Sequence, residues 1–174
     1  MEKRIILGVA FDWGKRKGLD IFKELAQKLD RERYLIILVG TNDNIDIELP
    51  ENIVSIHRTQ NQKELAKLYT AADLFFNPTR EDNYPTVNME ALACGTPVLT
   101  FDTGGCSEII DDFTGKAIVE GGIRDILKEI ELICEHDIYK SEDCLKRAKK
   151  FDKKQRFDEY IDLYEELGKW KKKR

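Results

Sequence analysis

Short apolar runs alternate with helix-patterned segments along most of this chain. Tyr34–Val39 is a continuous apolar run, typical of a strand that is buried on both faces of a parallel sheet. Strands separated by helices and short polar loops imply right-handed crossovers. The pattern therefore predicts an α/β fold, a Rossmann-like doubly wound parallel sheet of about six strands with helices on both faces. The strands are expected at residues 4–11, 34–39, 52–56, 73–77, 98–101 and 116–119.

Beyond residue 119 the pattern contains helices alone, at residues 123–134, 141–150 and 152–170. A chain of 174 residues is long enough for one sizeable core and short for two. We therefore expect residues 1–174 to form a single domain, in which 139–174 are extra terminal helices. The last helix carries an apolar stripe, and we expect most of that stripe to pack against the core. Its members are Phe157, Tyr160, Ile161, Tyr164 and Leu167.

Composition favours a cytoplasmic domain. No run approaches the roughly 20 apolar residues that span a bilayer, and the chain enters a strand almost at its start instead of a signal peptide. The net charge of −4 gives no support for a nucleic-acid partner. Two histidines and four cysteines without metal-type spacing argue against a structural metal and indicate reduced, partly buried thiols.

The stretch 82–97 carries the clearest chemical signal. A helix is expected to begin near Pro85 or Thr86, where backbone N–H groups and the helix dipole favour an anion such as phosphate. Glu90 follows Thr86 by four residues, about 6 Å along the axis, so its carboxylate could accept hydrogen bonds from a ribose diol attached beside that phosphate. Asp82, nearer the helix tip, would meet a group attached to the second phosphate. A carboxylate pair alone would be functional in only a minority of such loops.

This stretch resembles the donor site of glycosyltransferase family 4, whose members are retaining sugar transferases of the GT-B fold. The family signature is Glu, seven residues, Glu, a small-residue helix and Gly-x-Pro; here Asp82 replaces the first Glu, and Glu90 and Gly95-Thr96-Pro97 follow. The resemblance extends over nearly the whole chain in the family's order. It includes Gly8-Val9-Ala10, Lys17-Gly18-Leu19-Asp20, Leu65-Ala66-Lys67-Leu68-Tyr69, Ala71-Ala72-Asp73, Gly104-Gly105, Glu108 and Gly115.

The resemblance implies roles for the residues of this stretch. Asp82 would contact hydroxyl groups of the donor sugar, and Glu90 would hold the ribose. The backbone amides of Thr86 and Val87 would bind the second phosphate. Asn83, Tyr84 and Pro85 complete the donor-binding stretch.

Lys15, Arg16 and Lys17 lie on the loop after the first strand. Loops at the carboxyl ends of parallel strands converge on the ligand crevice, so these cations could neutralise a departing pyrophosphate. The alternative is a solvated charge run. By resemblance Lys17 is a catalytic residue together with Asp82. Many relatives have a further Arg where this chain has Phe11, and Arg16 could supply that second cation.

Two other loops belong to the expected crevice. His57-Arg58-Thr59 follows the third strand, and by resemblance this position lines the nucleobase, so Arg58 and Thr59 count as donor-binding residues. His57 alone is more typical of a structural or surface histidine. Gly104 and Gly105 would either approach the sugar or phosphate closely or form a simple turn.

The resemblance implies a hexosyltransferase-type enzyme that moves a sugar from a nucleotide sugar to a glycan or lipid-linked acceptor. The process would be the synthesis of surface polysaccharide, such as capsule or lipopolysaccharide, without cofactor or metal. The N-terminal acceptor domain of such enzymes is missing here, so we expect a fragment, a truncated product or a subunit of a split enzyme, inactive alone. A non-catalytic nucleotide-sugar-binding module, an epimerase and a phosphorylase are the alternatives. The basic tail 169–174 would either touch the inner membrane surface or be a solvated terminus.

Overall fold

A computed structural model describes residues 2–171 of the chain. A parallel six-stranded sheet has the order β3-β2-β1-β4-β5-β6, in which the first strand lies beside the fourth. The predicted fold class is thereby confirmed. The strands are β1 Arg4–Val9, β2 Tyr34–Val39, β3 Ile53–Ile56, β4 Leu74–Asn77, β5 Val98–Phe101 and β6 Gly115–Ile118.

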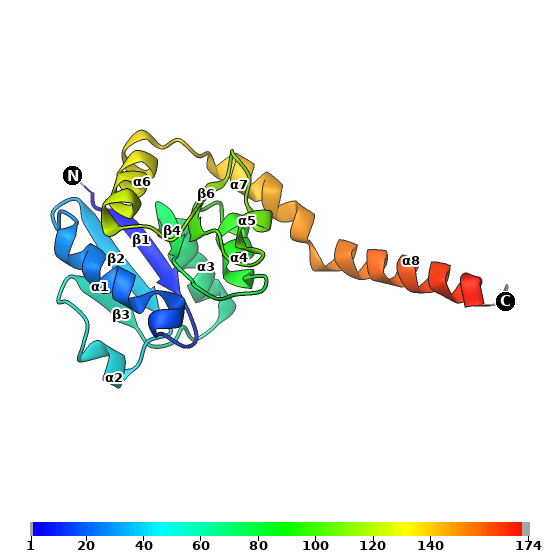
Figure 1. Cartoon of the computed structure of the whole chain (residues 1–174), viewed down its shortest axis with the longest axis horizontal. Helices are drawn as coiled ribbons and strands as arrows, with labels where there is room; N and C mark the ends of the chain where they lie inside the picture. Colours follow the sequence, from blue (N-terminus) through cyan, green and yellow to red (C-terminus); the bar gives the residue numbers. More distant parts are fainter. Residues whose placement is uncertain (1, 172–174) are drawn as a thin grey trace.

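Helices cover both faces of this sheet (Figure 1). Side chains alternate between the faces along each strand: Leu74 and Phe76 lie in one hydrophobic core, whereas Phe75 lies in the other. Helices α1 and α6 bury the first core, and α3, α4, α5 and α7 contribute to the second. The helices are α1 Leu19–Lys28, α2 Asp43–Asp46, α3 Gln62–Ala71, α4 Thr86–Ala93, α5 Cys106–Ile109, α6 Ile123–His136, α7 Ser141–Ala148 and α8 Lys153–Lys171, with short 3-10 turns η1 Lys15–Lys17 and η2 Lys149–Phe151.

Helix α8 departs from the expected packing. It extends away from the body of the domain (Figure 1), and its apolar stripe is exposed, with Tyr164 at 71% and Phe157 at 62%. The prediction that most of this stripe packs against the core is wrong, because the other helices already cover both faces of the sheet. The basic tail falls partly on residues 172–174, which lie outside the described part of the chain.

The four cysteines carry free thiols, as expected, and three of them are buried. Among the described residues no helix is both long and apolar enough to cross a membrane.

Candidate functional site

The strand order creates a crevice at the carboxyl edge of the sheet. From β1 the chain builds outward to β2 and β3, and then returns to place β4 on the other side of β1. The loops that follow β1 and β4 therefore run to opposite faces, and ligands of this fold class usually bind in the crevice between two such loops. These two loops carry Lys17 and Asp82.

Lys17 and Asp82 meet across this crevice. The Lys17 Nζ lies 2.6 Å from the Asp82 Oδ2, and each side chain is 18% exposed. Gly18 makes the approach possible: its φ is +77°, and a Cβ there would lie 2.5 Å from the Pro78 Cγ. The topology thus joins the two residues predicted to be catalytic, although they are 65 positions apart.

A third loop supports the segment that carries Asp82. The amide of Gly105 donates to the Asn83 carbonyl at 2.8 Å, and a Cβ at Gly104 would collide with the Asp82 carbonyl oxygen. Gly104 also has a φ of +53°, which side chains rarely tolerate. The two glycines form the expected turn before α5, and they also let the loop after β5 pack directly behind residues 82–84.

Helix α4 begins at Thr86, next to this segment, and Pro85 is its N-cap without a side-chain hydrogen bond to the first turn. An uncapped first turn offers backbone N–H groups and the positive end of the helix dipole to an anion. Inside the domain, Asn77 Nδ2 donates to Asn88 Oδ1 at 2.8 Å, which fastens the helix to β4. Thr86 and Val87 therefore occupy the position predicted for phosphate contacts.

Glu90 stands one turn further along α4, at the surface. The buried Tyr69 hydroxyl donates to its Oε2 at 3.2 Å. Burial and the Glu90 charge raise the pKa of Tyr69 far above its ordinary value, so the hydroxyl remains a donor. Tyr69 thereby orients the carboxylate.

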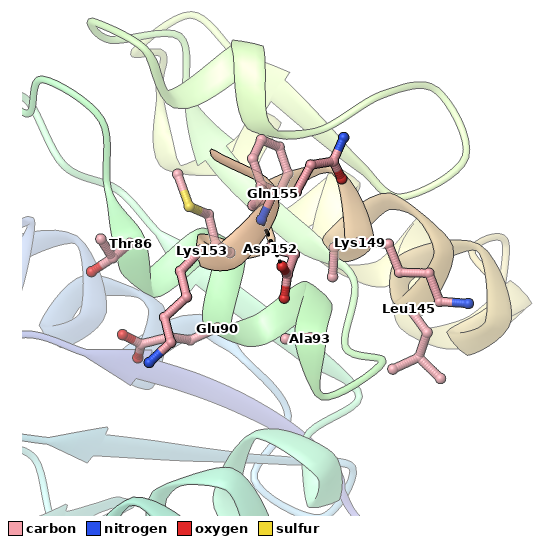
Figure 2. A pocket seen from close by; sticks show the side chains of 11 residues that line it. Thr86, Glu90, Ala93, Leu145, Lys149, Asp152, Lys153 and Gln155 are labelled. Carbon is pink, nitrogen blue, oxygen red and sulfur yellow. Dashed lines mark hydrogen bonds between the residues drawn. The ribbon is translucent and has the colours of Figure 1, made fainter. Parts of the chain in front are cut away.

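A pocket of ≈790 Å³ opens beside Glu90, between α4, α7 and the start of α8. Figure 2 shows Thr86 and Glu90 on one wall, with the Lys153 side chain pointing toward Glu90. Residues from α4 and from the last two helices thus share one hollow. Its lining comprises Thr86, Met89, Glu90, Ala93, Leu145, Ala148, Lys149, Phe151, Asp152, Lys153 and Gln155.

Three other predicted residues, Arg16, Arg58 and Thr59, lie on loops at the same edge of the sheet. Arg16 is nearly half exposed, and its Nη2 lies 3.7 Å from the Asp12 Oδ2. Arg58 is exposed and Thr59 is half-buried, both just after β3. Their roles remain predictions.

His57 instead belongs to a local polar cluster with α2. Its Nε2 lies 2.6 Å from the Asp46 Oδ2, and this hydrogen bond raises the pKa of His57. Ser55 and His57 donate hydrogen bonds that lower the pKa of Asp46. Asp43 lies near enough that these acids and His57 could together hold a metal ion, although exposed acidic groups often show such spacing without one.

Arg80 lies beside these loops, and the sequence analysis did not single it out. Its guanidinium donates to both Asp20 carboxylate oxygens, at 2.8 and 3.0 Å, and to the Glu120 Oε1 at 2.6 Å. The Asp20 hydrogen bond raises the pKa of Arg80 further. Partial burial opposes ionisation of Asp20, yet Arg80 outweighs it and holds the pKa of Asp20 below its usual value. The only sequence signal was an Arg two positions before Asp82.

Comparisons with known proteins agree with this architecture. The family model "Glycosyl transferases group 1" matches residues 2–154. A D-inositol 3-phosphate glycosyltransferase of Mycobacterium sp. (strain KMS) is 30% identical over 117 residues, which are 60% of this chain and 26% of that protein. The N,N'-diacetylbacillosaminyl-diphospho-undecaprenol alpha-1,3-N-acetylgalactosaminyltransferase of Campylobacter jejuni is 23% identical over 157 residues, 87% of this chain and 42% of that protein.

Among solved structures, the sucrose-phosphate synthase from Thermosynechococcus elongatus superimposes with a TM-score of 0.81 at 22% identity, over 95% of this chain and 46% of that one. This chain thus spans less than half the length of these three proteins. The family match covers nearly all of it, and the chain therefore belongs to the glycosyl transferases group 1 family.

Proposed function

We propose that this chain is the donor-binding part of a retaining glycosyltransferase of family 4 that takes a sugar from a nucleoside diphosphate sugar. The observation that carries the proposal is the Lys17–Asp82 pair at 2.6 Å, beside the uncapped start of α4. A cation, a carboxylate and free-standing helix amides at one crevice match the needs of a sugar diphosphate: charge neutralisation, hydroxyl recognition and phosphate binding.

Each group has a separate task in this proposal. Lys17 neutralises the diphosphate as it leaves; its ammonium has three donors, so it can keep Asp82 while it contacts phosphate oxygen. Asp82 accepts from sugar hydroxyls, with Asn83 and Tyr84 beside it. Glu90, oriented by Tyr69, accepts from the ribose diol. The leaving diphosphate would help deprotonate the acceptor on the same face, so that configuration is retained.

The acceptor side is proposed on the relatives' names. The Campylobacter jejuni relative is named for a diphospho-undecaprenol acceptor, which supports a glycan or lipid-linked acceptor and a place in surface polysaccharide synthesis. The acceptor would be bound by a further domain or subunit, as expected for a chain that spans 42% of that relative.

Titration calorimetry with UDP, GDP and ADP, and with CMP as a monophosphate control, tests donor binding. Glu90→Ala should weaken the binding of the preferred diphosphate by about 2–4 kcal/mol, because two charge-assisted hydrogen bonds are lost. Glu90→Gln keeps an acceptor for Tyr69 and should fall between wild type and Glu90→Ala. An unchanged dissociation constant in Glu90→Ala would remove Glu90 from the site.

Glu24→Ala is the matched control. Glu24 lies on α1 and is 4.0 Å from Lys28 in an exposed pair, so its removal should leave nucleotide binding unchanged. If none of the four nucleotides binds the wild-type chain or raises its unfolding temperature, the donor-binding proposal fails for this chain.

A further inference from the structure

Arg80 connects three loops at the carboxyl edge of the sheet. Its Nη1 donates to the Lys15 carbonyl at 2.5 Å, and its backbone amide donates to the Arg16 carbonyl at 2.9 Å. The paired bonds to Asp20 reach the first turn of α1, and the bond to Glu120 reaches the loop after β6. One side chain, 19% exposed, thus joins its own loop to residues 15–20 and to Glu120, two segments that are far away in the sequence.

The contacts flank the Lys17–Asp82 pair on both of the loops that carry it. Lys15 is the first residue of the η1 turn, which ends at Lys17, and Asp20 follows three positions later. Arg80 itself precedes Asp82 by two positions. The neighbouring Thr79 hydroxyl donates to the Glu81 carbonyl at 3.0 Å, which fixes the backbone between Arg80 and Asp82.

We infer that Arg80 is a positioning residue for the donor site: it holds the loop of Lys17 against the loop of Asp82, so that the pair is formed before ligand binds. The identity of the ligand rests on the proposed function. The contacts by which Arg80 joins the two loops, called the clamp below, do not depend on it. A preformed pair avoids the entropy of ordering two loops when the diphosphate arrives.

Arginine is required for this geometry. The planar guanidinium bonds both oxygens of Asp20 and still has donors for Lys15 and Glu120. A lysine offers a single charged point and cannot reproduce the paired bonds. Arg80→Lys should therefore behave like Arg80→Gln, although it keeps the charge.

The first experiment is amide hydrogen exchange on the 174-residue chain without ligand. In Arg80→Lys and Arg80→Gln, the amides of residue 80 and Gly18, which donate to Arg16 and Lys15, should exchange at least roughly tenfold faster. Amides of β1 and β2 should not change. Equal exchange in wild type and both variants would overturn the clamp.

The second experiment is a double-mutant cycle on diphosphate binding, with whichever of UDP, GDP and ADP binds the wild-type chain. Arg80→Gln alone should weaken diphosphate binding roughly tenfold relative to the wild type. When Lys17 is already replaced by Gln, adding Arg80→Gln should weaken binding by less than about twofold, because Arg80 acts through Lys17. A structural defect would instead give the same loss in both backgrounds, and that result would refute the positioning role. If no diphosphate binds the wild type, the proposed function fails. The exchange experiment still tests whether Arg80 holds the two loops together.

Arg33→Gln is the control for losing an arginine ion pair. Arg33 lies 2.5 Å from Glu135 and precedes β2, at the opposite edge of the sheet, so both readouts should match the wild type. If Arg80→Gln does not fold, Asp20→Asn removes the charge of the paired partner and should show the same faster exchange at Gly18. Unchanged exchange in a folded Asp20→Asn would contradict the inference.

Discussion

Charged side chains in the crevice and apolar side chains on helix α8 show opposite degrees of exposure. In the crevice Lys17, Asp82 and Arg80 are charged, yet their side chains are only 18–19% exposed. In α8 aromatic side chains such as Tyr164, at 71%, face solvent. Loops at a topological switch point lie close together because the strands that carry them are neighbours. Each of these partly buried charged side chains has a partner of opposite charge. In these two regions the exposure of a side chain therefore depends on the neighbouring elements as well as on residue type.

The largest test of this contrast compares two phenylalanines. Phe76→Ala should lower the free energy of unfolding by about 3–5 kcal/mol, because Phe76 is buried between sheet and helices and its removal leaves a cavity. Phe157→Ala on α8 should change it by less than about 0.5 kcal/mol. Urea unfolding followed by circular dichroism measures both. A loss above about 2 kcal/mol for Phe157→Ala would mean that α8 packs against something in solution.

Replacing a glycine by alanine should have opposite effects on stability in the two regions. Gly104→Ala should destabilise the domain by roughly 1–3 kcal/mol, because φ is +53° and the added methyl meets the Asp82 carbonyl. Gly168→Ala meets nothing within 4 Å and should instead raise the local stability of α8 by up to about 1 kcal/mol.

Urea unfolding measures the first change, and the helical signal together with amide exchange in α8 measures the second. Gly104→Ala should also weaken diphosphate binding, since the Asp82 segment must shift. If Gly104→Ala is as stable as wild type, the loop after β5 does not support residues 82–84.

Sequence reasoning succeeded where the signal was local. The six strands lie within two residues of their expected positions, because apolar runs bounded by turns leave few alternatives. The meeting of Lys17 and Asp82 was also predictable, since loops after parallel strands share one edge.

The features that the sequence analysis did not predict depend on residues far away in the sequence. Arg80 owes its importance to Asp20 and Lys15, which lie 60 and 65 positions away, and no local pattern reveals them. The sequence pattern of α8 identifies an apolar face, but it does not identify the element against which that face would pack. The four-residue helix α2, capped by Asn42 through the amides of Asn44 and Ile45, is too short for a periodic pattern.

The smallest expected effect concerns pH and the exposed His57–Asp46 pair. The hydrogen bond raises the folded-state pKa of His57 above its ordinary value of 6.5. Its contribution to stability is therefore complete below about pH 6.5 and is lost as pH rises through the folded-state pKa. Asp46, whose pKa is lowered, stays ionised across this window. Thermal unfolding of wild type and His57→Gln should differ most at pH 5.5 and least at pH 8.5, with His136→Gln as the control. A difference that grows with pH would show that His57 contributes in its neutral form, and that the contact holds no ion pair.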